Sequence, residues 1–187
     1  MNVYDFDKTI YHNDCTVDFY FYELRKHPFL MRYLPIQIFG WLGYFLKMHD
    51  KTKMKNYFYK YLKGIKNIDE EVTEFWNKHI KLIHKWYFNQ QKEDDMVISA
   101  SAFFMVKPAC ERLGIKNVIA SPVDQYQGEV TGKNCHGAQK AIVFKEAGYD
   151  KIDKFYSDSY SDQPLADLAA ESYLVKGERL VPWKKRV

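Results

Sequence analysis

Two carboxylates and a hydroxyl, each two residues from the next, stand directly after the first apolar segment of the chain. Residues 2–5, Asn-Val-Tyr-Asp, predict a short buried strand of the kind that parallel sheets contain. Asp5 would end that strand, at the edge where α/β sheets place their ligand sites, with Asp7 and Thr9 close behind it. Acids and a hydroxyl at such an edge favour a site for a cation and a phosphate. The alternative is a strand end followed by a solvated Asp-Lys turn.

Two further polar residues stand where later strands and helices are expected to meet. Ser99 ends a strand expected at 96–99, and either Ser99 or Ser101 would otherwise serve as the N-cap of the next helix. Lys140 lies in an early turn of a helix expected at 135–147. A cation near a helix N-terminus is electrostatically disfavoured, so a role for Lys140 beyond surface charge calls for an anionic partner.

Two more carboxylates follow near the end of the chain. Asp158 ends a strand expected at 154–158, and Asp162 stands two residues before Pro164, where a helix N-cap is the local alternative. Each residue has an ordinary explanation when taken alone. Their recurrence at successive strand ends favours one shared site, because ligands of such sheets bind at the carboxyl ends of the strands.

These groups together resemble the haloacid dehalogenase superfamily of phosphatases. Residues 5–9, Asp-Phe-Asp-Lys-Thr, are similar to its DxDxT first motif, with Lys8 where glycine is more common. Ser99 matches the hydroxyl of the second motif, and Lys140 matches the lysine of the third. Residues 158–162, Asp-Ser-Tyr-Ser-Asp, match the DSxxD fourth motif, so all four motifs occur in order.

The resemblance implies a magnesium-dependent phosphatase with an aspartyl-phosphate intermediate on Asp5. Asp7 would protonate the leaving oxygen and then deprotonate the water that hydrolyses the intermediate. Mg²⁺ would be held by Asp5, the backbone carbonyl of Asp7 and Asp158. Lys140 would pair with Asp5 and the phosphoryl group, and Asp162 would orient Lys140 or a water on the metal.

The resemblance also implies a phosphate-binding group around the same site. Ser99 and the backbone at Ala100, which leads into the next helix, would bind the phosphoryl oxygens. Thr9 belongs to this group, more as a support for Asp7 than as a substrate contact. Asp14 stands where phosphoserine phosphatases carry a longer acid that binds the amino acid, and its alternative is the N-cap of the first helix. The shorter side chain weakens phosphoserine as a substrate.

Two parts of the chain differ in the secondary structure that their sequence patterns predict. Residues 1–13 and 91–187 alternate short apolar strands with helices, which predicts an α/β fold with a doubly wound parallel sheet. Residues 14–90 have a helical pattern, and the resemblance identifies them as an inserted all-helical C1 cap of the phosphoserine-phosphatase-like subfamily IB on a Rossmann-like core. Expected elements include a long helix over 69–90, a hairpin over 125–132, a helix over 164–170 and a last strand over 173–175.

Composition narrows the class of protein. A chain of 187 residues with 47% hydrophobic residues can bury the core of one domain, or of one domain with an insertion. A net charge of +4 is too mild to argue for nucleic acid, and none is expected as a partner. The three cysteines show neither zinc spacing nor a disulfide framework, which fits a reducing cytosol. With no signal peptide expected before Asp5, we predict a cytoplasmic protein and leave its oligomeric state open.

The predicted cap contains an apolar run followed by a lysine-rich stretch. Residues 33–48 are apolar but shorter than the ~20 residues of a spanning helix, and residues 51–66 carry six lysines and no acid. Together, residues 33–66 predict peripheral contact with an anionic membrane. This apolar cap and the segment 156–165 are similar to phosphatidylglycerophosphatases of the C type. The alternatives are that the run forms the cap's own core or a dimer contact.

We therefore predict a phosphomonoester hydrolase of the haloacid dehalogenase type. Its substrate would be a phospholipid phosphate, such as phosphatidylglycerophosphate, or a small phosphorylated metabolite, such as phosphoserine. The alternative is a non-catalytic module that binds RNA or anionic surfaces through the lysines and aromatic residues of 51–66. That alternative leaves unexplained the residues that match the four motifs, namely Asp5, Asp7, Ser99, Lys140 and Asp158.

Overall fold

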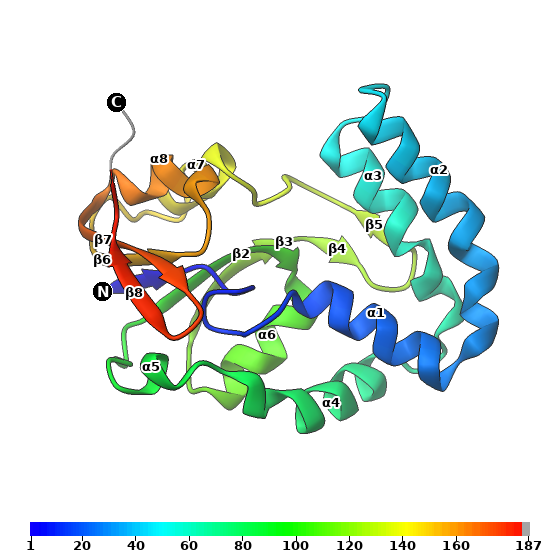
Figure 1. Ribbon diagram of the computed structural model, residues 1–187, viewed down its shortest axis with the longest axis horizontal. Coiled ribbons are helices and arrows are strands. Elements are labelled where there is room, and N and C mark those ends of the chain that lie inside the picture. The colour runs from blue at the N-terminus through cyan, green and yellow to red at the C-terminus, as the bar shows by residue number, and fades with distance from the viewer. Residues whose placement is uncertain (185–187) are drawn as a thin grey trace.

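The computed structural model describes residues 1–184, and a central sheet of six strands organises them (Figure 1). The strand order is β3-β2-β1-β6-β7-β8, in which every neighbouring pair is parallel except β7 and β8. The strands of this sheet, in chain order, are β1 (Asn2–Tyr4), β2 (Met96–Ala102), β3 (Asn117–Ser121), β6 (Ile152–Ser157), β7 (Ala169–Lys176) and β8 (Arg179–Pro182).

Helices cover both faces of the sheet because the side chains of its central strands alternate. Val3 belongs to a buried cluster with α7 (Ala138–Glu146) and α8 (Gln163–Ala166). The next residue, Tyr4, points to the other face and belongs to a cluster with α6 (Phe103–Arg112). Strands buried on both faces and flanked by helices confirm the predicted α/β class and its doubly wound sheet. The antiparallel edge strand β8 was not predicted.

Residues 14–90, predicted to be all-helical, contain no strand within the described chain and form the right and lower parts of the view in Figure 1. Trp76 of α4 donates a hydrogen bond to the backbone oxygen of Met105 in α6 over 2.8 Å, so α4 joins the core cluster. The helices are α1 (Cys15–Lys26), α2 (Leu34–Phe45), α3 (Lys51–Phe58), α4 (Ile68–His79) and α5 (Lys85–Phe88), with 3-10 turns at Pro28–Tyr33, Tyr59–Gly64 and Ile80–Leu82.

The α2–α3 hairpin projects beside the sheet (Figure 1). Its two arms pack closely because two glycines of α2 face the chain that returns through α3. A Cβ added at Gly40 would overlap the side chain of Tyr57, and one added at Gly43 would overlap His49. Gln37, the third buried residue of α2, accepts a hydrogen bond from the Tyr20 hydroxyl over 2.7 Å. The inward face of α2 is therefore made of glycine and glutamine.

The prediction of one long helix over 69–90 is wrong. Helix α4 ends at His79 and a 3-10 turn follows at Ile80–Leu82. The chain becomes extended at Ile83, which forms an isolated antiparallel bridge with Tyr11. The backbone N–H of His84 donates to the oxygen of Ile10 over 2.8 Å. Residues 82–84 therefore exchange backbone hydrogen bonds with residues 10–12. A continuous helix would use the same backbone groups for its own hydrogen bonds.

Three boundaries near the end of the chain also differ from prediction. The helix expected at 164–170 stops after one turn, because residues from Ala169 onward join the sheet as β7 beside β6. That strand is longer than the predicted 173–175, and a turn at Gly177, with φ of 60°, leads into β8. The helix predicted at 135–147 begins at Ala138.

The small hairpin predicted at 125–132 is present, two residues earlier than expected. It pairs β4 (Val123–Asp124) with β5 (Glu129–Val130) in antiparallel register. Gly128 ends the turn with φ of 61°, a conformation that favours glycine. The turn is therefore encoded by the residue that the sequence pattern indicated.

Candidate active site

A cavity of about 440 Å³ opens at the carboxyl ends of the central strands, between the sheet and the α2–α3 hairpin. Residues from distant parts of the chain line it. The core side contributes Asp5, Asp7, Ala100, Ser101, Lys140, Asp158 and Asp162, and the helical side contributes Asp14, Trp41, Lys51, Lys55 and Phe58. Most of the residues predicted to form one site therefore meet there.

Lys140 connects two of the predicted carboxylates. Its Nζ donates to Oδ1 of Asp5 and to Oδ2 of Asp162, both over 2.7 Å, and only 2% of the lysine is exposed. Asp162 is held in turn by the Ser157 hydroxyl, which donates to the same oxygen over 2.8 Å. Asp162 stands at the N-cap position of α8 but makes no side-chain cap bond there, and its Oδ2 atom instead pairs with Lys140.

Burial and the attraction between the two charges have opposite effects on this pair. Burial raises the pKa of Asp5 to about 7, even though the Lys140 ammonium favours the charged carboxylate. Burial also disfavours the charge on Lys140, but Asp5 and Asp162 together outweigh it and raise the pKa of the lysine. Asp5 and Asp162 therefore share one ammonium group, so the positive charge in direct contact with them is smaller than their combined negative charge.

Asp7 accepts hydrogen bonds from one residue of α1 and from one residue of the sheet. Its Oδ1 accepts a hydrogen bond from the backbone N–H of Cys15 over 2.7 Å, and its Oδ2 accepts one from the Ser101 hydroxyl over 2.5 Å. Burial and then the neighbouring Asp14 carboxylate raise the pKa of Asp7 to about 6. A carboxyl group that titrates near neutral pH is suited to proton transfer.

Thr9 supports a different acid from the one predicted. It is fully buried and absent from the cavity wall of residues 1–184, and its Oγ1 accepts a hydrogen bond from the backbone N–H of Asp158 over 3.0 Å. The prediction that it supports Asp7 is therefore wrong. Thr9 instead holds the loop that carries the fourth-motif aspartate, whose pKa burial raises.

Lys8 has a backbone conformation that favours glycine. Its φ is 56°, in the left-handed region that residues with a Cβ adopt at a cost. The side chain lies on the cavity wall, and its charge favours the ionised form of Asp158. The lysine therefore adds a charge to the site at the expense of local backbone strain.

The structure separates the two serines of β2. Ser99 is fully buried inside the strand, where its Oγ accepts a hydrogen bond from the backbone N–H of Ser101 over 3.0 Å. The strand continues past Ser99, the predicted end, to Ala102. Ser101 rather than Ser99 lines the cavity beside Ala100, and neither serine caps α6, whose N-cap is Ala102.

Asp14 is the helix N-cap that the sequence offered as its alternative role. Its Oδ1 accepts a hydrogen bond from the backbone N–H of Val17 over 3.0 Å, so it is the N-cap of α1. The same side chain lies on the cavity wall.

Two lysines of α3 were not predicted as site residues. Nζ of Lys55 donates to the backbone oxygen of Ala100 over 2.6 Å and to Oδ1 of Asn134 over 2.7 Å, which joins the helical side to the core. Burial lowers the pKa of Lys51, and burial followed by repulsion from Lys51 lowers the pKa of Lys55 to about 8. Their spacing of four residues places both on one face of α3, which was the available sequence signal.

The chain belongs to the haloacid dehalogenase-like hydrolase family, whose model matches residues 3–167. The predicted family and the prediction of a hydrolytic enzyme are confirmed by this match. A search of curated proteins finds no matching sequence.

Solved structures share the fold at low sequence identity. A protein of unknown function from Bordetella pertussis Tohama I superposes with a TM-score of 0.67 at 16% identity, covering 93% of this chain and 88% of its own. A phosphoserine phosphohydrolase-like protein from Francisella tularensis subsp. tularensis SCHU S4 gives 0.54 at 19% identity, covering 93% and 87%. A haloacid dehalogenase family hydrolase from Salmonella enterica subsp. enterica serovar Typhi gives 0.58 at 9% identity, covering 89% and 59%. These similarities establish the fold.

Proposed function

We propose that the protein is a Mg²⁺-dependent phosphomonoester hydrolase that forms an aspartyl-phosphate on Asp5. The observation that carries the proposal is the buried Lys140–Asp5 pair on the wall of a cavity that Asp7 also lines. Lys140 occupies Oδ1 of Asp5, which leaves Oδ2 as the attacking oxygen. Phosphate esters are anionic, so their hydrolysis depends mostly on positioning and on neutralising charge.

The proposed reaction has two displacement steps. Oδ2 of Asp5 attacks phosphorus, the bond from phosphorus to the ester oxygen breaks, and protonated Asp7 gives its proton to that oxygen. Asp7, now a carboxylate, takes a proton from a water molecule that attacks the same phosphorus. The bond from phosphorus to Asp5 then breaks, which releases inorganic phosphate and restores both carboxyl groups.

The donor set of the cavity fits a hard divalent cation. Asp5 and Asp158, both on the cavity wall, would supply carboxylate oxygens, and the backbone carbonyl of Asp7 would supply a third. Burial raises the pKa of Asp5 and Asp158, as expected where carboxylates lack compensating charge. Oxygen ligands of this kind suit Mg²⁺, which usually keeps several waters. When bound, the ion would neutralise the phosphoryl oxygens and so permit attack by a carboxylate.

The test of this function is phosphate release from p-nitrophenyl phosphate. We expect activity that requires Mg²⁺, disappears with a chelator, and is abolished by Asp5→Asn. Asp167→Asn, at an exposed position, is the matched control. A folded wild-type protein without activity on a broad panel of phosphate monoesters would contradict the proposal.

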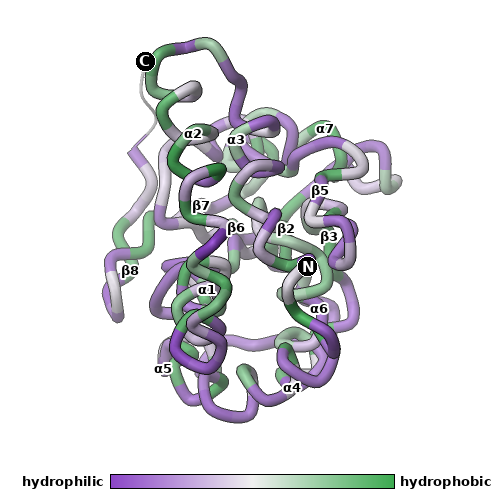
Figure 2. The backbone as a smooth tube through the Cα atoms, turned by 90° about the vertical axis from the view of Figure 1, so that its right-hand side faces the viewer, coloured by the Kyte–Doolittle hydropathy of each residue, from purple (hydrophilic) through white to green (hydrophobic). Residues whose placement is uncertain are grey.

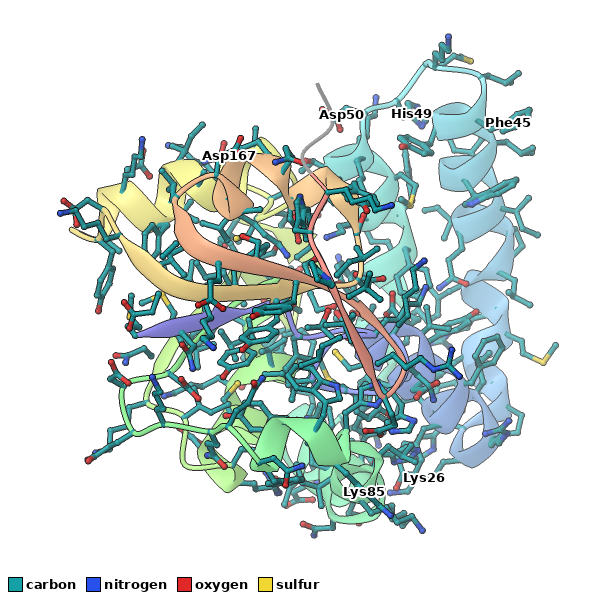
Figure 3. The ribbon with its side chains drawn as sticks, turned by 60° about the vertical axis from the view of Figure 1, so that its left-hand side comes forward. Lys26, Phe45, His49, Asp50, Lys85 and Asp167 are labelled. Carbon is teal, nitrogen blue, oxygen red and sulfur yellow. The ribbon has the colours of Figure 1, made fainter. Side chains whose placement is uncertain are left out.

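We further propose a phospholipid phosphate as substrate, because α2 is amphipathic in the reverse of the usual sense. A surface helix normally buries its apolar stripe. Here Gln37, Gly40 and Gly43 face inward, whereas Trp41 is 59% exposed and Phe45 is 71% exposed. Hydrophobic colour dominates α2 in Figure 2, and Phe45 projects outward near the hairpin tip in Figure 3.

The apolar face of α2 is continuous with the cavity. Trp41 belongs both to the exposed face and to the cavity wall, so a lipid held in a bilayer could reach the site along it. Lys51 and Lys55 would bind the anionic head group from the side opposite Asp5. No helix within residues 1–184 is long and apolar enough to cross a membrane, and the proposed contact is peripheral.

Two alternatives have less support, namely that the apolar run forms the core of the cap and that the lysine-rich stretch binds RNA. Exposure of the large residues of α2 does not fit the cap's own core, and the inward direction of Lys51 and Lys55 does not fit a surface for RNA. Asp14 on the cavity wall is the feature that favours a small amino-acid phosphate such as phosphoserine.

Vesicle flotation separates these substrates. We expect the wild-type protein to float with phosphatidylglycerol vesicles, and Trp41→Ser with Phe45→Ser to remain in the soluble fraction. Phe88→Ser, 54% exposed on α5, removes a similar aromatic side chain elsewhere and should still float. Activity on phosphatidylglycerophosphate should fall only in the α2 variant. Equal flotation of all variants, or phosphoserine as the preferred substrate, would overturn the lipid proposal. The proposal would also fail if the wild-type protein does not float and the α2 substitutions convert a dimer into a monomer.

A further inference from the structure

A second group of metal-ligating side chains lies where α1 and α4 meet. Glu23 and His27 stand one helical turn apart at the end of α1, and Glu71 lies in the first turn of α4. One ligand atom from each residue lies within 4.8 Å of the other two. Their neighbour Lys26 lies at the opposite end of the helical region from Phe45 in Figure 3. The group is therefore separate from the hairpin tip and from the wall of the catalytic cavity.

Glu23 is the unusual member of this group. Its side chain is 0% exposed, and within residues 1–184 neither of its carboxylate oxygens has a hydrogen-bond partner. A buried carboxyl group without a hydrogen bond needs a proton or a cation to be tolerated. Burial and then the Glu71 carboxylate raise the pKa of Glu23 to about 8, which agrees with that requirement.

The three ligand atoms surround a common point. Nε2 of His27 lies 3.5 Å from Oε1 of Glu71 and 4.0 Å from Oε2 of Glu23. A tetrahedral zinc ion with bonds of about 2.0–2.1 Å separates its ligand atoms by about 3.3 Å. The 4.0 Å separation is too long for a hydrogen bond, and 3.5 Å is at its upper limit, so small inward shifts around an ion explain the convergence better than direct bonding.

The charges of the group also leave room for a divalent cation. Nζ of Lys26 lies 2.6 Å from Oε2 of Glu71 and 2.9 Å from Oε2 of Glu74. Lys78 is a second ammonium group, and its charge acts on Glu74. Lys26 binds the Oε2 atom of Glu71 and leaves its Oε1 atom directed at His27. Three ionised carboxylates, those of Glu23, Glu71 and Glu74, still outnumber these two ammonium groups, which favours a bound cation.

We propose that Glu23, His27 and Glu71 bind a divalent transition metal ion of the zinc class, which joins α1 to α4. An imidazole with two carboxylates suits zinc, cobalt or nickel better than magnesium, which prefers an all-oxygen shell. The His27 side chain is 32% exposed, which gives the ion a path from solvent and room for a water as the fourth ligand. The ion would stabilise the contact between the two helices and takes no part in phosphate hydrolysis.

Cobalt titration of the metal-stripped full chain tests the proposal. With Mg²⁺ in large excess to occupy the catalytic site, we expect the wild-type protein to bind one Co²⁺ with the visible absorption of a four-coordinate ion. His27→Gln should weaken this binding by more than about tenfold. Glu74→Gln, which removes a charge from the same network but no proposed ligand, should retain it. Equal Co²⁺ binding by wild type and His27→Gln would overturn the proposal.

Thermal unfolding distinguishes a metal from a proton. We expect Zn²⁺ to raise the Tm of the wild-type protein and of Asp5→Asn, but not that of Glu23→Gln, whose amide keeps the size of the carboxyl group. If a proton shared by Glu23 and Glu71 explains the burial, the Tm of the wild type will not respond to Zn²⁺, and the proposal fails. Because Asp5→Asn is inactive under the proposed function, this result does not depend on activity.

Discussion

Asp5 and Glu23 are two buried acids with different surroundings. Burial raises the pKa of both, to about 7 for Asp5 and to about 8 for Glu23. Asp5 has a fixed ammonium at 2.7 Å and faces a cavity, whereas Glu23 has neither a hydrogen-bond donor in residues 1–184 nor a place on that cavity wall. A raised pKa alone therefore does not mark a carboxyl group as part of an active site, because its counter-charge and its access to a cavity matter as well.

Lys140→Met should have the largest effect, because it leaves Asp5 without its counter-charge, as Glu23 is. We expect phosphate release to fall by about 10³-fold and the free energy of unfolding to fall by about 3–5 kcal/mol. Steady-state kinetics and urea denaturation measure the two effects. Lys145→Met, at an exposed position of the same helix, should change neither. An active Lys140→Met protein would show that Asp5 does not need the pair.

Asp7→Asn should have the next largest effect, because it keeps the size of the side chain but removes the proton that the leaving oxygen needs. We expect kcat to fall by about 10²–10³-fold for p-nitrophenyl phosphate and more for an alkyl phosphate, whose leaving group needs protonation more. The ratio of the two rates is the measurement. An equal loss on both substrates would indicate that Asp7 acts only through structure.

Lys55→Gln should have a smaller effect, because it removes one of several positive charges on the cavity wall. Lys55 donates to two neutral oxygens, and burial, followed by repulsion from Lys51, lowers its pKa to about 8. It is charged below that pH and neutral above it, so kcat/KM for an anionic substrate should decrease as the pH rises through about 8. The variant should lose about tenfold in kcat/KM at pH 7 and should lack this decrease. Lys53→Gln, at an exposed position of α3, should keep the wild-type profile.

Lys8→Gly should have the smallest effect and the opposite sign. Glycine adopts φ of 56° without the clash that a Cβ creates, so we expect stabilisation by about 1 kcal/mol. For a chain of this size the Tm should rise by about 2–4 °C. Lys47→Gly, at φ of 59° after α2, is a parallel case and should behave alike. A lower Tm in both variants would mean that the lysine contacts outweigh the strain.

The sequence predicted the parts of the site that depend on local position. Asp5 and Asp158 follow short apolar strands, so the topology of a parallel sheet was enough to place them at one edge. The cation near the start of α7 required an anion, and Lys140 has two. These predictions depended on elements whose hydrophobic pattern is unambiguous.

The remaining site residues depend on tertiary contacts that no local pattern encodes. Thr9 and Asp158 are 149 residues apart in the chain, and their hydrogen bond exists only because β1 and β6 pair. Lys55 belongs to a lysine-rich stretch, and only the packing of α3 over the sheet turns it inward. Ser101 was taken for a possible helix cap because β2 was expected to end two residues before it.

The break of the predicted 69–90 helix has a similar cause. Its apolar spacing is helical throughout, and Ile83 is extended because its neighbours exchange backbone hydrogen bonds with residues 10–12. The one-turn α8 gives way to β7 for the same reason, since pairing with β6 competes successfully with the helical preference of Ala169 and Ala170.

The hydrogen bond between Asp7 and the backbone of Cys15 makes the pKa of Asp7 depend on the position of α1. Cys15 is the first residue of α1, so a swing of that helix would remove a donor from Oδ1 of Asp7. A lost donor makes the carboxyl hold its proton more tightly. Asp7 would then have the pKa that proton transfer requires only while α1 keeps its hydrogen bond to it. An open form that admits substrate or releases product would not catalyse the reaction.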